Sequence, residues 1–127
     1  QKKVALRWND GAQAELLADP DEIRRATINL IANALDATPE GGHVTLDVTQ
    51  NDDVCIAVCD DGFGVPPERR SMLFERFAGT RAGGGTGLGL YIVRRIAEKY
   101  GGRAEYAPLE PRGSRFAIVV PKERADD

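Results

Sequence analysis

The alternation of apolar and polar residues along the chain predicts several short strands. They are expected at residues 4–8, 14–18, 43–49, 54–59, 103–107 and 114–120. The first two flank an Asn-Asp-Gly turn at residues 9–11, which predicts a hairpin. The strand at 54–59 is apolar on both faces. We therefore expect it at the centre of a sheet that helices cover on at least one side.

Helical periodicity marks three further segments, residues 20–38, 67–74 and 87–100. The first helix has a clear start: Asp19 is the expected N-cap and Pro20 the first helical residue. Glu22 stands where a capping box requires a carboxylate. Gly101 and Gly102 are expected to end the third helix.

Length and composition indicate a single soluble domain. The chain has 127 residues, enough for one two-layer core, and its 42% hydrophobic and 29% charged residues exclude a disordered or membrane-embedded class. No apolar run approaches the roughly 20 residues of a spanning helix, so we expect no direct membrane insertion. The net charge of −3 gives no field that favours nucleic acid. Because the chain starts at Gln1 without Met, we expect the C-terminal part of a longer protein.

The two cysteines, Cys55 and Cys59, lie on the same side of one predicted strand. Four residues of strand separate their Cα atoms by roughly 13 Å, well beyond the ~7 Å that a disulfide allows. We therefore expect reduced core thiols, which agrees with a cytoplasmic location.

A row of polar side chains interrupts the apolar pattern of the first helix. At about 100° per residue, Asn29, Asn33 and Asp36 fall within one narrow arc. Such an arc on an isolated helix is most often a solvated face. Two glycine-rich segments follow it in the sequence, Asp60-Asp61-Gly-Phe-Gly at 60–64 and Gly-Gly-Gly-Thr-Gly-Leu-Gly-Leu at 83–90. Alone, the first could be a turn or a calcium-loop fragment and the second a flexible hinge.

Together these three segments have the chemistry of a magnesium–nucleotide site. The amide oxygens of Asn29 and Asn33 can bind a hard cation without placing negative charge beside a triphosphate. Asp60, delivered to the sheet edge by a buried strand, can accept a hydrogen bond from the exocyclic amine of adenine. Gly62 and Gly64 let the backbone lie against the ring. The glycines before Leu88 place N–H groups at a helix start, where the helix dipole favours phosphate oxygens.

Four segments in this order resemble a known family. Residues 29–37 (NLIANALDA), 60–66 (DDGFGVP), 73–77 (LFERF) and 83–93 (GGGTGLGLYIV) are similar to the asparagine, first glycine, phenylalanine and second glycine boxes of the catalytic ATP-binding domain of sensor histidine kinases. That domain belongs to the wider gyrase, chaperone, histidine kinase and mismatch-repair ATPase superfamily. The resemblance covers nearly the whole chain, so we expect residues 1–127 to form one catalytic ATP-binding domain.

The resemblance implies a fold and a set of roles. The fold is the Bergerat fold, an α+β two-layer sandwich with a mixed sheet of about five strands, three helices on one face and a flexible ATP lid at about 78–86. Asn33 would be the main Mg²⁺ ligand with Asn29 as its helper, and both would count as catalytic. Asp60 would anchor adenine. The further residues expected at ATP are Asp36, Ala37, Gly62, Gly64, Val65, Phe77, Thr80, Arg81, Gly85, Thr86, Gly87, Leu88 and Gly89, with Arg81 and Thr86 near the γ-phosphate.

One position distinguishes phosphotransfer from hydrolysis. Superfamily members that hydrolyse ATP carry a glutamate one turn before the metal asparagine, where this chain has Asn29. An amide is no general base near neutral pH, so water activation should be poor. The acceptor is then expected to be a histidine on a separate dimerisation domain, with onward relay to a response regulator. A protein-serine kinase, a slow ATPase and a non-catalytic nucleotide-binding module are the alternatives.

Two charged positions leave the phosphate contacts and the partners open. Asp36 stands where many kinases have a basic residue that reaches a phosphate, so Arg81 or a basic residue of a partner domain must compensate. The only histidine, His43, follows a Gly-Gly turn, and we expect it at a strand edge without a catalytic role. The arginine pairs at 24–25 and 94–95 are either solvated faces or a docking surface for an acidic acceptor domain or response regulator. The fragment is expected to be a monomer and its parent a homodimer, and the sequence leaves open whether the parent is anchored to a membrane.

Overall fold

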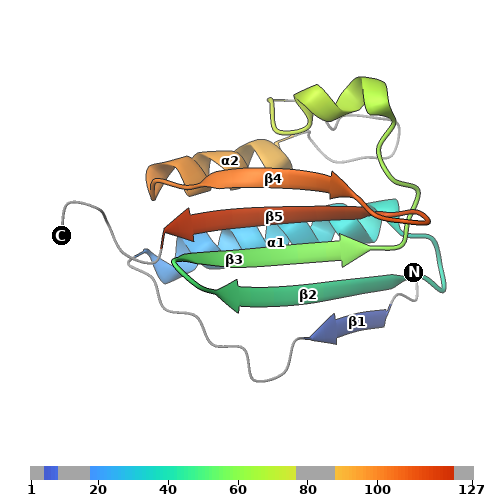
Figure 1. Ribbon diagram of the computed structural model, residues 1–127, viewed down its shortest axis with the longest axis horizontal. Coiled ribbons are helices and arrows are strands. Elements are labelled where there is room, and N and C mark those ends of the chain that lie inside the picture. Colours follow the sequence, from blue (N-terminus) through green and yellow to red (C-terminus); the bar gives the residue numbers. More distant parts are fainter. Residues whose placement is uncertain (1–4, 9–17, 77–87, 122–127) are drawn as a thin grey trace.

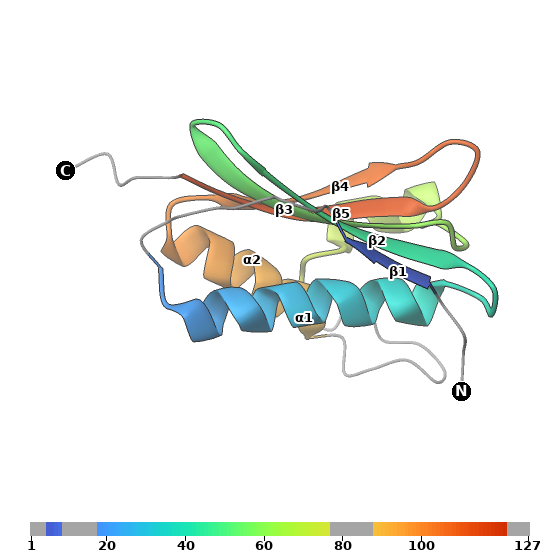
Figure 2. The same cartoon turned by 90° about the horizontal axis from the view of Figure 1, so that it is seen from below.

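In the part of the chain that the structure describes, two α-helices cover one face of a five-stranded sheet (Figures 1 and 2). The computed structural model describes residues 5–8, 18–76 and 88–121. Within them the elements are β1 (Ala5–Trp8), α1 (Pro20–Ala37), β2 (His43–Gln50), β3 (Asp53–Asp60), the 3-10 helix η1 (Pro67–Met72), α2 (Gly89–Lys99), β4 (Arg103–Pro108) and β5 (Ser114–Pro121). The predicted α+β two-layer sandwich is confirmed.

The sheet is mixed, as predicted, with strand order β1-β2-β3-β5-β4. Four strands are antiparallel to their neighbours, and β1 runs parallel to β2. β3 is the central strand, with β2 on one side and β5 on the other, which its apolar sequence required. Its last residue, Asp60, pairs with Val44 of β2 and Ser114 of β5, so this carboxylate sits at the edge where β3 ends.

The core lies between the sheet and the two helices. Alternate residues of β3 (Val54, Ile56 and Val58) are buried beneath the helices, and Leu30 of α1 and Val93 of α2 are fully buried against them. Figure 2 shows α1 and α2 side by side under the sheet, running in opposite directions. No helix in the described part of the chain is long and apolar enough to cross a lipid bilayer.

The start of α1 differs from the prediction in one respect. Asp19 is the N-cap, and its carboxylate accepts from the N–H of Asp21 at 2.9 Å. The capping box does not form, because the backbone N–H of Asp19 donates to the hydroxyl of Tyr100 at 3.0 Å. Glu22 instead accepts from Lys99 and from that same hydroxyl. Lys99, at the end of α2, and Tyr100, its C-cap, thus bind the groups that would otherwise form the capping box.

Two further expectations need correction, and a third, the hairpin, is not tested. Residues 67–74 form a short 3-10 helix, Pro67–Met72, with no buried residue in place of an amphipathic α-helix, so two α-helices rather than three cover the sheet in the described residues. The strand at 4–8 exists, but its partner among the described residues is the parallel β2, and the second arm of the predicted hairpin, 14–18, lies outside them except for Ala18. Cys55 and Cys59 are unbonded thiols, as expected, but only half-buried and outside the core.

The side chain of Phe74 packs on the core. Its ring meets that of Phe116 edge-on, with centroids 6.1 Å apart, and Phe116 in turn contacts Tyr106. This contact favours a structural role for Phe74. Phe77, the second aromatic residue of the same segment, lies outside the described residues.

Candidate functional site

The predicted asparagine row lies at the seam between α1 and the start of α2. Asn29 and Asn33 are half-buried and stand one turn apart, next to the buried row of Ala26, Leu30 and Ala34. The side-chain amide of Asn29 donates a long hydrogen bond of 3.4 Å to the carbonyl of Gly89. Donation by the amide leaves the carbonyl oxygen of Asn29 for another partner. Asn29 and Asn33 are therefore only partly solvated, whereas Asp36, the third residue of the row, is exposed.

Asp60 is the most unusual carboxylate in the described residues. Only 3% of the residue is exposed. One carboxylate oxygen accepts from the N–H of Gly62 at 2.9 Å, and the other is buried with no hydrogen-bond partner in the part of the chain that the structure describes. Burial raises the pKa of Asp60, as does the negative charge of Asp61, while backbone N–H donors from Gly62 and Ser114 counteract the rise. A buried acceptor without a partner is costly unless a ligand supplies the donor.

The loop that follows Asp60 is pressed against the C-terminal end of α1. The N–H of Phe63 donates to the carbonyl of Ala37 at 3.3 Å. A Cβ atom at Gly62 would lie 2.1 Å from that same carbonyl, so this position accepts no side chain. Gly64 has φ +79°, a conformation that favours glycine. The two glycines that were predicted to lie against a ring therefore suit the backbone conformation and packing of this loop. Ala37, another predicted residue, contacts the loop at Gly62.

The remaining predicted residues of the described part border the same region. Asp36 is exposed on the last turn of α1, and Val65 packs partly against the core. Leu88 is the N-cap of α2 without a side-chain capping bond, and a Cβ atom at Gly89 would meet none of the described residues within 4 Å. The N–H groups at a helix start suit an anionic ligand.

Six predicted ATP contacts cannot be placed. Phe77, Thr80, Arg81, Gly85, Thr86 and Gly87, and with them the predicted lid at 78–86, lie outside the described residues. Their roles stay predictions.

A magnesium ion fits the donor atoms that the structure brings together. Magnesium in nucleotide sites is held by one or two protein oxygens and by phosphate oxygens. The amide oxygens of Asn29 and Asn33 are of this kind, and they add no negative charge beside a polyphosphate. Among residues 18–76 and 88–121, no three His, Cys, Asp or Glu side chains cluster in a way that could hold a metal ion.

Sequence reasoning missed a second residue of the glycine loop, Asp61. Its carboxylate accepts from the backbone N–H of His43 at 2.8 Å and contacts Nδ1 of that imidazole at 2.9 Å. The hydrogen bonds from the backbone and side chain of His43 lower the pKa of Asp61. His43 does lie at a strand edge, as predicted, but it is tied to the loop that carries Asp60. Two consecutive aspartates were the only signal in the sequence.

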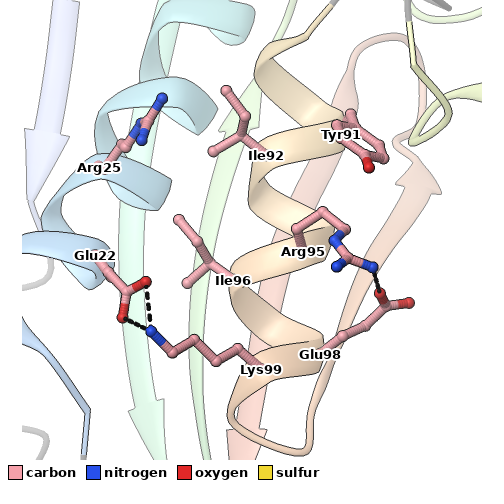
Figure 3. A pocket seen from close by; sticks show the side chains of 8 residues that line it. All are labelled: Glu22, Arg25, Tyr91, Ile92, Arg95, Ile96, Glu98 and Lys99. Carbon is pink, nitrogen blue, oxygen red and sulfur yellow. Dashed lines mark hydrogen bonds and ion pairs between the residues drawn. The ribbon is translucent and has the colours of Figure 1, made fainter.

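A groove between the two helices lies apart from these residues (Figure 3). It has a volume of about 640 Å³ and is lined by Glu22, Arg25, Tyr91, Ile92, Arg95, Ile96, Glu98 and Lys99. None of the predicted ATP contacts lines it. Two ion pairs lie among these residues. Lys99 Nζ lies 3.0 Å from a carboxylate oxygen of Glu22, and Arg95 Nη1 lies 3.8 Å from one of Glu98. Of the four arginines predicted to be either solvated or docking, Arg24 pairs with Asp21 on the surface and Arg94 lies over the ring of Tyr91.

Comparison with known proteins gives a consistent result. The model of the family described as histidine kinase-, DNA gyrase B-, and HSP90-like ATPase matches residues 18–124. The chain is 37% identical over 118 residues to the sensor histidine kinase WalK of Bacillus subtilis (strain 168), covering 86% of this chain and 19% of WalK. It is 37% identical over 124 residues to the sensor histidine kinase ZraS of Escherichia coli O157:H7, covering 94% of this chain and 26% of ZraS. It therefore spans about a fifth to a quarter of the length of these relatives.

Solved structures agree with this match. The catalytic domain of the histidine kinase ThkA in a nucleotide-free form superposes with a TM-score of 0.83 at 29% identity, covering 95% of this chain and 82% of that one. Full-length ShkA, solved in complex with AMPPNP, gives a TM-score of 0.79 at 30% identity, covering 93% of this chain and 25% of ShkA.

Proposed function

Because the chain belongs to the histidine kinase-, DNA gyrase B- and HSP90-like ATPase family, we propose that it binds Mg-ATP and donates the γ-phosphoryl group to a histidine on a separate domain. The observation that carries this proposal is the carboxylate oxygen of Asp60 that is buried at the end of β3 with no hydrogen-bond partner among the described residues, beside Gly62, a position with no room for a side chain. An adenine amine would supply the missing donor. The asparagine row and the start of α2 border the same region.

Each residue has a distinct part in this proposal. Asp60 holds the base by accepting from its exocyclic amine, and the Gly62–Gly64 backbone lies along the ring. Asn33 and Asn29 hold the metal through their amide oxygens. The first N–H groups of α2, at Leu88 and Gly89, face phosphate oxygens. Magnesium, when bound, neutralises charge on the triphosphate and so assists transfer of its last phosphoryl group.

The acceptor follows from the residue at position 29. An asparagine has no basic atom that could take a proton from water near neutral pH. Its amide is also engaged with the carbonyl of Gly89. The γ-phosphoryl group is therefore retained until an acceptor side chain is presented in line with it. We propose a histidine of a dimerisation domain as that acceptor and a response regulator as the next; that the relatives are named sensor histidine kinases supports a histidine as the acceptor.

The surroundings of the domain form part of the same proposal. We propose that it works in the cytoplasm, as a monomeric unit of a homodimeric parent whose other domains sense the signal. The predicted lid residues Thr80, Arg81, Gly85, Thr86 and Gly87, together with Phe77, would close over the phosphates. Arg81 would compensate the negative charge of Asp36.

The proposal is tested by removing the metal asparagine. Asn33→Ala should abolish phosphotransfer from labelled ATP to a supplied acceptor domain, because the cation loses its main protein ligand. Asn51→Ala is the matched control, since Asn51 is an exposed residue of the turn between β2 and β3 at the opposite end of the sheet. Undiminished transfer in Asn33→Ala would refute the metal role. Turnover of ATP without any acceptor would refute phosphotransfer in favour of an ATPase.

A further inference from the structure

His43 and Asp61 are joined by three hydrogen bonds. The N–H of Asp61 donates to the carbonyl of His43 at 3.3 Å, and the N–H of His43 donates to the Asp61 carboxylate at 2.8 Å. The other carboxylate oxygen contacts Nδ1 of the imidazole at 2.9 Å. Both side chains keep contact with water, with 46% and 42% of their surfaces exposed. The pair therefore combines a fixed backbone geometry with a side chain that can take up a proton.

The pair holds the loop on which the adenine anchor depends. Asp61 lies directly between Asp60, whose carboxylate is the anchor, and Gly62, whose N–H binds that carboxylate. On one side the turn before β2 presses on Asp61, because a Cβ at Gly42 would lie 2.8 Å from its carboxylate. On the other side a Cβ at Gly113 would lie 2.0 Å from the carbonyl of Asp60. The loop is thus clamped from both sides, and the His43–Asp61 bonds complete the clamp.

The charges of the pair reach Asp60. Asp61 is negative at neutral pH, and its charge opposes ionisation of the neighbouring Asp60. A proton on His43 would offset that charge and favour the ionised form of Asp60. An ionised carboxylate is a stronger hydrogen-bond acceptor than a protonated one.

We propose that His43 and Asp61 form a positioning pair for Asp60, and that protonation of His43 tightens the binding of an adenine nucleotide. The inference rests on the proposed function, since it assigns a nucleotide base to Asp60. Neither side chain touches the nucleotide in this proposal; both act through the placement and charge of Asp60. Domains with another residue at position 43 would lack the pH dependence.

Asp61 is the charged residue in contact with the imidazole, and the neighbouring elements carry other charged residues. Asp60 and Asp61 lie at the end of β3, and Glu40 lies in the turn between α1 and β2. Asp36 lies on the last turn of α1. β1 is paired with β2 so that Ala5 is opposite His43, and Arg7 of β1 is opposite Thr45, two positions along.

Two variants and one control test the pair. His43→Gln removes the titrating imidazole and keeps a side-chain donor, and Asp61→Asn removes the charge and keeps an oxygen for the N–H of His43. Glu105→Gln is the control, because it breaks an exposed ion pair of similar length, 2.7 Å to Arg103, on a strand away from the loop. Binding of ADP is measured by calorimetry at pH 6 and pH 8. The titration of the Asp60 carboxyl is followed by carbon NMR without nucleotide.

The proposal expects His43→Gln to bind ADP within twofold of the unmodified domain at pH 8 and about three- to tenfold more weakly at pH 6, because imidazoles are protonated in the lower part of this range. Comparing the two proteins cancels the titration of ADP itself. The Asp60 carboxyl should titrate at higher pH in His43→Gln and at lower pH in Asp61→Asn, and Glu105→Gln should change neither quantity. The proposal would be overturned if ADP binding by His43→Gln had the same pH dependence as binding by the unmodified domain. It would also be overturned if the Asp60 carboxyl titrated at the same pH in both variants as in the unmodified domain. Failure of the unmodified domain to bind ADP would instead refute the proposed function, and the nucleotide-free titration would still decide whether the pair acts on Asp60.

Discussion

Asp60→Asn should weaken nucleotide binding and stabilise the nucleotide-free domain at the same time. Only 3% of Asp60 is exposed, and one of its carboxylate oxygens has no hydrogen-bond partner among the described residues. That oxygen therefore lowers the stability of the nucleotide-free domain, while it would serve as the acceptor for adenine. Asparagine has nearly the same shape and can keep the bond from the N–H of Gly62. It removes the buried charge, but it turns one acceptor into a donor, which adenine's amine cannot use.

The size of both effects follows from the hydrogen bonds involved. A hydrogen bond to a charged group contributes about 1.5–3 kcal/mol, so its loss should weaken ADP binding about 10- to 150-fold. Leaving a neutral amide in place of a charged oxygen without a partner should raise the free energy of unfolding by about 1 kcal/mol. That gain corresponds to a rise in Tm of about 3–5 °C for a domain of this size.

The stabilisation should depend on pH with a defined sign. Because burial raises the pKa of Asp60 in the folded state, its favourable contribution is present below the unfolded pKa of about 3.9 and is lost as the pH rises through the folded pKa. The amide of the variant does not titrate. The difference in Tm between Asp60→Asn and the unmodified domain should therefore grow between pH 4 and pH 8.

Thermal unfolding without nucleotide and calorimetry with ADP measure the two effects. Asp53→Asn is a suitable control, since Asp53 is an exposed residue at the other end of β3. The base offers a further check: a hypoxanthine nucleotide presents an oxygen in place of the amine, and the variant's amide can donate to it. Unchanged ADP affinity, or a Tm difference that does not vary with pH, would refute the assignment of Asp60 as a buried, ionised anchor for adenine.

Three further predictions concern the frame around the site. Leu30→Ala should lower the free energy of unfolding by about 2–5 kcal/mol in urea titrations, because Leu30 is fully buried between helix and sheet, and a smaller loss would mean that the core collapses around the gap. Gly62→Ala should weaken ADP binding more than tenfold, because its Cβ would lie 2.1 Å from the carbonyl of Ala37, and unchanged affinity would show that the loop moves freely. Glu22→Gln should slightly lower the free energy of unfolding at pH 7, and this loss should shrink below about pH 4. Tyr100 and Lys99 lower the pKa of Glu22, so its stabilising contribution is present above the unfolded pKa and is lost as the pH falls through the folded pKa. A loss of stability that is constant with pH would contradict this.

Local patterns in the sequence were sufficient to predict the parts of the site that depend on one element. The apolar run before Asp60 predicted a central strand ending in a carboxylate, and the spacing of Asn29 and Asn33 predicted their common face. Both statements need only the periods of strand and helix. What the sequence did not reveal is that Gly62 is fixed by the end of α1, because that contact joins two elements that meet only in the folded chain.

The wrong predictions share this cause. Glu22 has the spacing of a capping box, but its partners Lys99 and Tyr100 lie 77 and 78 positions away and bind it in place of the local N–H. The parallel pairing of the first strand with β2 was likewise not predicted, because alternation does not identify a partner, and the predicted hairpin stays untested since residues 9–17 lie outside the described part of the chain. Periodicity also failed for 67–74, where two prolines and a short apolar stretch produced a 3-10 turn without buried residues.

Asn29 unites the fold with the proposed chemistry. Its amide donates to Gly89 and so links α1 to the start of α2, where the phosphates would lie. A glutamate at this position could not donate, and its carboxylate would face a carbonyl oxygen. In the proposed function, the residue that offers water no base would therefore also link α1 to the start of α2 through its amide. Retention of the phosphoryl group and placement of that helix would then both depend on Asn29, with its carbonyl oxygen left for the metal.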